Sequence, residues 1–180
     1  MTISKRPMLA PSSPKKFRLF ATIAIVAVAL LGGLFYFSLS AKPAMPLVTF
    51  TNLKGDKIQA QQLRGKVVMV NFWATSCATC IAEMPQMVET YQKYHAQGLE
   101  YIGVAMSEDP PNYVINYAET RQLPFQVALD TDGSLARAFG NVRMTPTTFL
   151  IDKQGHILKR YLGKPSFEEL YGLLEQALKA

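Results

Sequence analysis

The stretch KVVMVNFWATSCATCIAEMP, residues 66–85, holds the features that decide the fold of this chain. Its first part, residues 66–73, is an almost continuous apolar run, which is typical of a strand buried on both faces of a sheet. Cys77 and Cys80 follow as a C-x-x-C pair, and from there apolar residues recur at helical spacing. We therefore expect a buried strand that leads into a helix over residues 77–95, with both cysteines at the start of that helix.

The spacing of the two cysteines favours redox chemistry. One helical turn places both sulfurs on one face, close enough for a disulfide. The free N–H groups and the dipole at a helix N-terminus stabilise a thiolate on Cys77. Because a thiol of low pKa is both the attacking and the leaving group, we assign attack to Cys77 and resolution of the mixed disulfide to Cys80.

Three other roles for the pair stay open from the residues alone: half of a zinc site, a static disulfide, or two unrelated core cysteines. A zinc site needs four ligands, and the two histidines, His95 and His156, stand at spacings unlike a zinc-finger pattern. A disulfide between residues three apart closes too short a loop to add much stability. Redox chemistry is the favoured interpretation, and we predict no metal site.

Beyond residue 46 the sequence alternates strands with helices. Strands are expected over residues 47–52, 66–73, 99–106, 125–129, 147–151 and 157–162, and helices over 77–95, 110–122, 134–139 and 166–178. Ser166 with Glu169 three residues later forms a capping box for the last helix. This order indicates an α/β sandwich in which helices flank a mixed central sheet.

An uncharged apolar segment precedes this region. Residues 19–39 form a 21-residue segment without a charge, which as a helix matches a hydrocarbon core of ~30 Å. Five basic residues and no acidic residue stand before it, so the N-terminus is expected in the cytoplasm of a bacterium and the domain in the periplasm. A cleaved signal peptide is the rival interpretation, but its apolar region is normally only ~7–15 residues long. We expect a basic tail over residues 1–18, a transmembrane anchor over 19–39, a linker over 40–46 and one domain over 47–180.

The charge of the chain excludes some classes of protein. The net charge of +6 comes from 19 Lys and Arg against 13 Asp and Glu. Five of these basic residues lie in the first 18 residues, so 19 minus 5 leaves 14 basic residues against all 13 acidic ones in the rest of the chain. A nearly neutral body argues against nucleic-acid binding. A charged fraction of 18% beside 49% hydrophobic residues argues against a disordered chain.

The residues around the cysteine pair resemble those of the thioredoxin fold. The run F-W-A-x-x-C-x-x-C and the later TPTTFLID, residues 145–152, stand in the order of that fold, and the resemblance covers residues 45–178. More narrowly, the chain is similar to the membrane-anchored, TlpA-like and ResA-like thiol:disulfide reductases of bacterial cytochrome c maturation. Many relatives carry Trp before the first cysteine and Pro before the second, where this chain has Ser76 and Thr79.

This resemblance implies roles for further residues. Glu83, three residues after Cys80, would be a buried glutamate whose raised pKa lets it take a proton from Cys80, and Asn71 replaces the buried aspartate of thioredoxin. Thr145 and Pro146 would form a cis-proline loop that binds substrate through main-chain groups, and Trp73 would shield the sulfurs. From periodicity alone, Glu83 would be a solvated helix residue and Trp73 a core aromatic.

The resemblance also implies partners. These are a disulfide-containing periplasmic protein such as apocytochrome c as substrate and a transmembrane thiol relay as electron donor. The reaction would need no cofactor, and we expect a monomer because no dimerisation segment is apparent.

Three alternative functions stay open. The first is a dithiol oxidant of the same fold. The second is a thiol peroxidase, although Ala74 stands where that class carries a threonine. The third is a metal-delivery module that uses both cysteines and nearby methionines to assemble a copper centre. Against the third, we interpret the histidines as surface residues and four methionines as core residues: Met84, Met87, Met106 and Met144.

Overall fold

The computed structural model describes residues 20, 23, 25–33 and 42–180 of the chain. The chain divides into two units, Met1–Ala41 and Lys42–Ala180. Within the first unit the described residues are helical, and the rest of the anchor expected over residues 19–39 lies outside the described residues. None of the helices in the described part is long and apolar enough to cross a bilayer.

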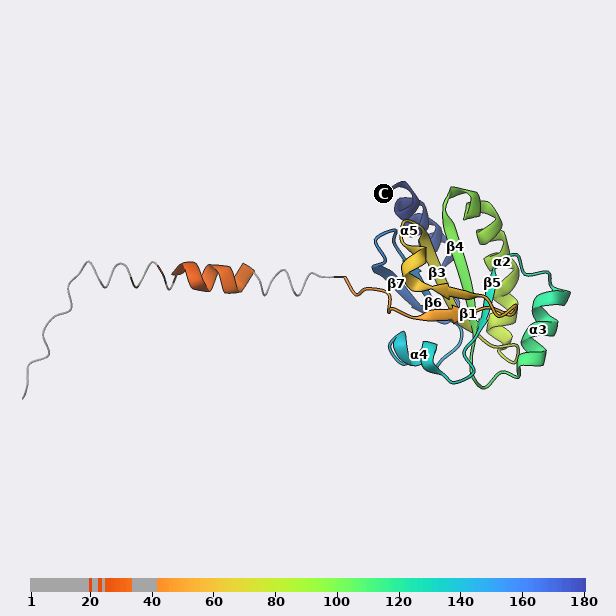
Figure 1. Cartoon of the computed structure of the whole chain (residues 1–180). Helices are drawn as coiled ribbons and strands as arrows, with labels where there is room; N and C mark the ends of the chain where they lie inside the picture. Colours follow the sequence, from red (N-terminus) through yellow and green to blue (C-terminus); the bar gives the residue numbers. More distant parts are fainter. Residues whose placement is uncertain (1–19, 21–22, 24, 34–41) are drawn as a thin grey trace, which may run out of the picture. The chain divides into compact units, whose positions relative to one another are not determined.

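A five-stranded mixed sheet forms the centre of the second unit, as expected (Figure 1). Its strand order is β5-β4-β3-β6-β7, with β3, β4 and β5 parallel and with β6 antiparallel to both of its neighbours. The strands are β3 (Val67–Trp73), β4 (Leu99–Ala105), β5 (Gln126–Leu129), β6 (Thr147–Ile151) and β7 (Ile157–Leu162). All seven residues of the central strand β3 are buried, which explains why its sequence is apolar except for Asn71.

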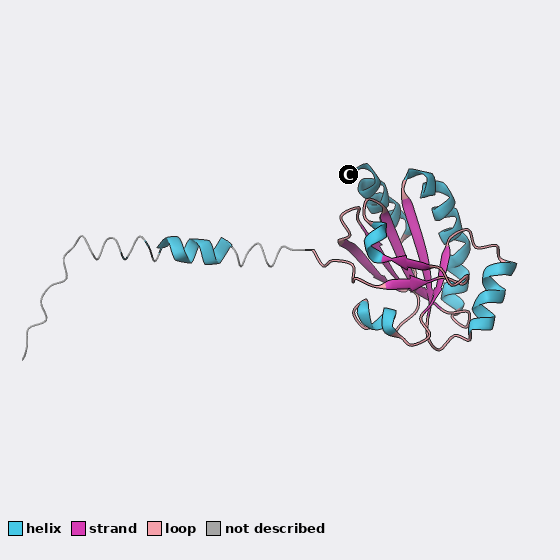
Figure 2. Cartoon of the chain, viewed as in Figure 1, coloured by secondary structure: helices cyan, strands magenta, loops and turns pink. Residues whose placement is uncertain are grey.

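Helices cover both faces of this sheet (Figure 2). They are α2 (Ala78–Tyr94), α3 (Pro111–Thr120), α4 (Ser134–Ala138) and α5 (Phe167–Lys179), with short 3-10 turns η1 (Ala60–Leu63) and η2 (His95–Gln97). The bounds of these four α-helices agree with the sequence prediction to within two residues. The structure adds β2 (Lys57–Gln59), which pairs with β1 (Thr49–Thr51) in a hairpin that the sequence analysis did not foresee.

The alternation of side chains along β3 divides the core into two layers. Val67, Met69 and Trp73 pack with α2 and α5 on one face. Val68, Val70 and Phe72 pack on the other face with residues of β1, η1 and α4. Since successive side chains of a strand point to opposite faces, one short apolar strand joins both layers.

Residues 43–45, which were expected in a linker, are hydrogen-bonded to the turn between β6 and β7 and to the first residue of β7. The Met45 N–H donates to the Gly155 carbonyl (2.8 Å), and the Ile157 N–H donates to the Pro43 carbonyl (2.7 Å). Met45 is also buried. Residues 43–45 therefore pack with the second unit, which includes them.

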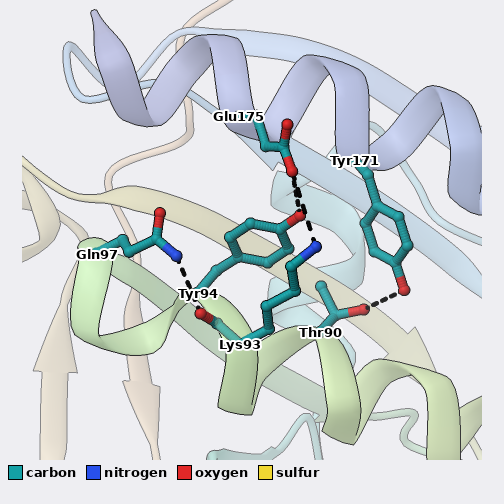
Figure 3. Close-up of polar contacts among 6 residues, drawn as sticks. All are labelled: Thr90, Lys93, Tyr94, Gln97, Tyr171 and Glu175. Atoms are coloured by element: carbon teal, nitrogen blue, oxygen red, sulfur yellow. Dashed lines mark hydrogen bonds and ion pairs between the residues drawn. The ribbon is translucent and has the colours of Figure 1, made fainter.

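Polar contacts between α2 and α5 secure the C-terminal end of α2 (Figure 3). The buried Tyr94 hydroxyl donates to Glu175 Oε1 (2.5 Å), and the Thr90 and Tyr171 hydroxyls lie 3.2 Å apart. Lys93 Nζ lies 3.8 Å from the same Glu175 oxygen. These contacts hold α2 against the domain at the end opposite to the cysteines.

Candidate active site

The cysteine pair forms a disulfide at the start of α2. Cys77 is the N-cap residue of this helix, and its Cα lies 5.2 Å from the Cα of Cys80. Cys77 is partly exposed, whereas Cys80 is fully buried. The structure therefore brings the two sulfurs together as the spacing predicted, with only the first of them open to a partner.

The helix N-terminus supplies a donor to the first sulfur. The Cys80 N–H donates to Cys77 Sγ over 3.2 Å. In the reduced protein the same N–H and the helix dipole stabilise a thiolate on Cys77, and they favour it over a thiolate on Cys80. An exposed, stabilised thiolate suits attack on a substrate, and a buried second thiol suits resolution within the protein.

Glu83 lies buried on α2, one turn beyond Cys80, with 1% of its surface exposed. Asn71 Nδ2 donates to Glu83 Oε1 (3.4 Å) and to Thr148 Oγ1 (2.8 Å). Burial raises the pKa of Glu83 from 4.5 to about 7, against the opposing effects of the Asn71 hydrogen bond and the Lys164 charge. The burial of Glu83 agrees with what the resemblance implied, and periodicity alone did not predict it.

A buried tyrosine adds to the polar groups of this layer of the core. The Tyr101 hydroxyl and Glu83 Oε2 are both buried without a hydrogen-bond partner among the described residues. Burial raises the pKa of Tyr101 well above its usual value, and the charge of Glu83 adds to the rise. No motif in the sequence pointed to Tyr101, because a tyrosine in an apolar strand looks like any other core residue.

The peptide bond between Thr145 and Pro146 is cis, as predicted. Pro146 directly precedes β6, whose first residue, Thr147, pairs with Phe72 near the end of β3. The loop to Cys77 starts from that same end of β3, so the cis-proline and the disulfide lie at one edge of the sheet. The Pro146 carbonyl accepts a hydrogen bond from the Gly163 N–H (2.8 Å).

Trp73 is fully buried in this oxidised form of the protein. Its ring packs against the Tyr117 ring with centroids 5.4 Å apart, and its Nε1 has no partner among the described residues. Trp73 is thus part of the same core cluster as Cys80.

Asp109 is a further residue of the site that the sequence analysis missed. This buried carboxylate accepts hydrogen bonds from both the N–H and the hydroxyl of Thr75, two residues before Cys77. Asp109 lies 32 positions after Cys77 in the sequence, and no spacing rule connects the two.

The methionines and histidines singled out in the sequence have no place in the dithiol site. Met84, Met87 and Met106 are buried as predicted, but the prediction for Met144 is wrong, because this residue is 59% exposed in the loop before the cis-proline. His95 is exposed and His156 is partly exposed. Among the described residues, no three His, Cys, Asp or Glu side chains are grouped so that they could hold a metal ion.

The sequence model of the Redoxin family matches residues 40–174. The chain belongs to the Redoxin family. Within it, the chain is 38% identical over 132 residues to the thiol-disulfide oxidoreductase ResA of Bacillus thuringiensis (strain Al Hakam), covering 73% of this chain and 75% of the relative. It is 38% identical over 130 residues to ResA of Geobacillus kaustophilus, covering 72% of this chain and 74% of the relative.

Solved structures agree with this membership. A thiol:disulfide interchange protein of the thioredoxin family from Chlorobium tepidum superposes with a TM-score of 0.70 at 28% identity, covering 77% of this chain and 98% of the other. This Redoxin-family chain is therefore a TlpA-like and ResA-like thiol-disulfide oxidoreductase with a thioredoxin-like fold.

Proposed function

We propose that this oxidoreductase reduces disulfides of proteins in the bacterial periplasm, with apocytochrome c as its substrate, while tethered to the inner membrane. The observation that carries the proposal is the arrangement of a partly exposed Cys77, a buried Cys80 and a buried Glu83 on successive turns of α2. This arrangement suits a dithiol that attacks a protein disulfide and then closes its own.

The reaction begins with the reduced protein. The Cys77 thiolate attacks one sulfur of the substrate disulfide, and the other substrate sulfur leaves as a thiolate. Cys80 then gives its proton to Glu83 and attacks Cys77 Sγ, which releases the second substrate thiolate. The substrate gains two electrons, and the protein is left with the Cys77–Cys80 disulfide.

The pKa of Glu83 supports its part in the second step. A base accepts a proton most effectively when its pKa is near the working pH, and burial raises the pKa of Glu83 to about 7. The cis-proline loop at the same edge of the sheet would bind the substrate through main-chain groups of Thr145 and Pro146. A transmembrane thiol relay would then return two electrons to the oxidised protein.

The proposed tether rests on the sequence of residues 19–39 and on the five basic residues before it. With the N-terminus in the cytoplasm, the domain is expected in the periplasm. Protease added to intact spheroplasts should therefore digest the domain, and survival of the domain until the inner membrane is opened would contradict this location.

The direction of electron flow is tested by the reduction potential of the pair. The full-length chain in detergent is equilibrated against glutathione or dithiothreitol, with Cys77→Ser as the control that cannot form the disulfide. We expect a value near about −270 mV, which is that of thioredoxin. A value near about −120 mV, as for the oxidant DsbA, would instead identify a disulfide donor that uses the same residues.

A further inference from the structure

The loop between β4 and α3 reaches across to the loop that carries Cys77. Asp109, in the first of these loops, is 5% exposed. Its Oδ2 accepts a hydrogen bond from the Thr75 N–H, and its Oδ1 accepts one from the Thr75 hydroxyl, both at 2.6 Å. Hydrogen bonds to a charged, buried carboxylate are among the stronger ones in proteins.

Backbone hydrogen bonds fix the position of Asp109 relative to the sheet. The Met106 N–H donates to the Trp73 carbonyl (3.0 Å), which extends the pairing of β4 with β3, and the Asp109 N–H donates to the Met106 carbonyl (3.0 Å). Pro110 and Pro111 follow directly and lead into α3. Since proline fixes its own backbone angle, Asp109 stands between two rigid elements.

Thr75 lies inside the turn that ends at Cys77. The Cys77 N–H donates to the Ala74 carbonyl (3.1 Å), which closes this turn around Thr75 and Ser76. The Asp109 bonds therefore hold the middle of the turn, and the backbone bond holds its ends. Neither contact involves a sulfur atom, so both can persist when the disulfide opens.

We propose that Asp109 and Thr75 are positioning residues for disulfide closure. They keep Cys77 Sγ within reach of Cys80 when the two sulfurs are no longer bonded to each other. Holding two reacting groups in place raises their effective concentration and so speeds their reaction and favours its product. The role applies to either direction of electron flow, because both directions pass through a mixed disulfide on Cys77.

Ellman's disulfide separates the two chemical steps in a single turnover of the full-length, reduced chain. In the first phase the Cys77 thiolate attacks the reagent, forms a mixed disulfide and releases one thionitrobenzoate. In the second phase Cys80 attacks Cys77 Sγ, the second thionitrobenzoate leaves, and the Cys77–Cys80 disulfide forms. Two electrons pass from the protein to the reagent, and each release is followed by absorbance.

Thr75→Val removes the hydroxyl donor and keeps the shape of the side chain, whereas Thr75→Ser keeps the donor. We expect Thr75→Val to slow the second phase about tenfold and to leave the first phase within about twofold of the wild type. In glutathione equilibria the same variant should favour the disulfide about tenfold less, a rise of the potential by about 30 mV. Thr75→Ser should restore both values.

A second change tests the other partner. Asp109→Asn keeps one acceptor oxygen and cannot accept both Thr75 hydrogen bonds, so its second phase should also be slow. The proposal is overturned if Thr75→Val closes its disulfide as fast as the wild type, or if Thr75→Ser is as slow as Thr75→Val. A role in stability alone would lower the thermal midpoint of the variants and leave the second phase unchanged.

Discussion

Glu83→Gln provides a direct measure of what burial does to the carboxyl group beside Cys80. The folded protein raises the pKa of Glu83 from 4.5 to about 7, so the folded state binds this proton more tightly than the unfolded state does. The contribution of Glu83 to stability is therefore fully present below about pH 4.5 and is lost as the pH rises to about 7. A pKa rise of this size corresponds to about 3 kcal/mol in the free energy of unfolding. Glutamine has nearly the same shape and no proton to lose.

The assay is urea unfolding of the oxidised wild type and of Glu83→Gln at several pH values. The variant should gain about 3 kcal/mol in stability relative to the wild type between about pH 4.5 and pH 8, because it escapes the cost of a buried charge. Glu89→Gln is the matched control, since Glu89 is exposed on the same helix. A difference between wild type and Glu83→Gln that stays constant over this range would refute the reasoning.

Three further changes test other contacts. Asp130→Ala should destabilise the protein by about 2 kcal/mol, measured by urea unfolding, because the buried carboxylate accepts two backbone N–H groups at the start of α4 (2.9 and 2.8 Å). Tyr101→Phe should leave stability unchanged or raise it in the same assay, because it removes a buried hydroxyl that has no partner among the described residues; a clear loss would reveal a partner. Asn71→Ala should raise the pKa of Glu83 above about 7, followed by NMR titration of the Glu83 carboxyl, because it removes the hydrogen bond that opposes the rise; an unchanged pKa would count against that bond.

Strand and helix positions were predictable because their hydrophobic patterns are strong. The run that became β3 is apolar apart from Asn71, since helices cover both faces of the sheet. By contrast, β2 has the pattern KIQ and packs only one residue, Ile58, against the core. Three residues with a single inward side chain carry too little periodicity to be recognised in a sequence.

Whether a contact of the site could be predicted depended on how many residues separate its partners in the sequence. Cys77 and Cys80 meet because one helical turn separates them, which is a local property. Met144 was misjudged because methionine is common in cores, and only the course of the loop before the cis-proline exposes it.

The amino-acid sequence by itself determined the order of strands and helices, the dithiol at the start of a helix and the family resemblance, because each of these depends on neighbouring residues or on a short spacing along the chain. Only the tertiary structure decided that Glu83 is buried against Asn71 and that Asp109 binds Thr75. Both contacts join segments that the folded sheet brings together. Burial and long-range hydrogen bonds arise when the chain closes on itself, and it is these that raise the pKa of Glu83 and hold the turn before Cys77.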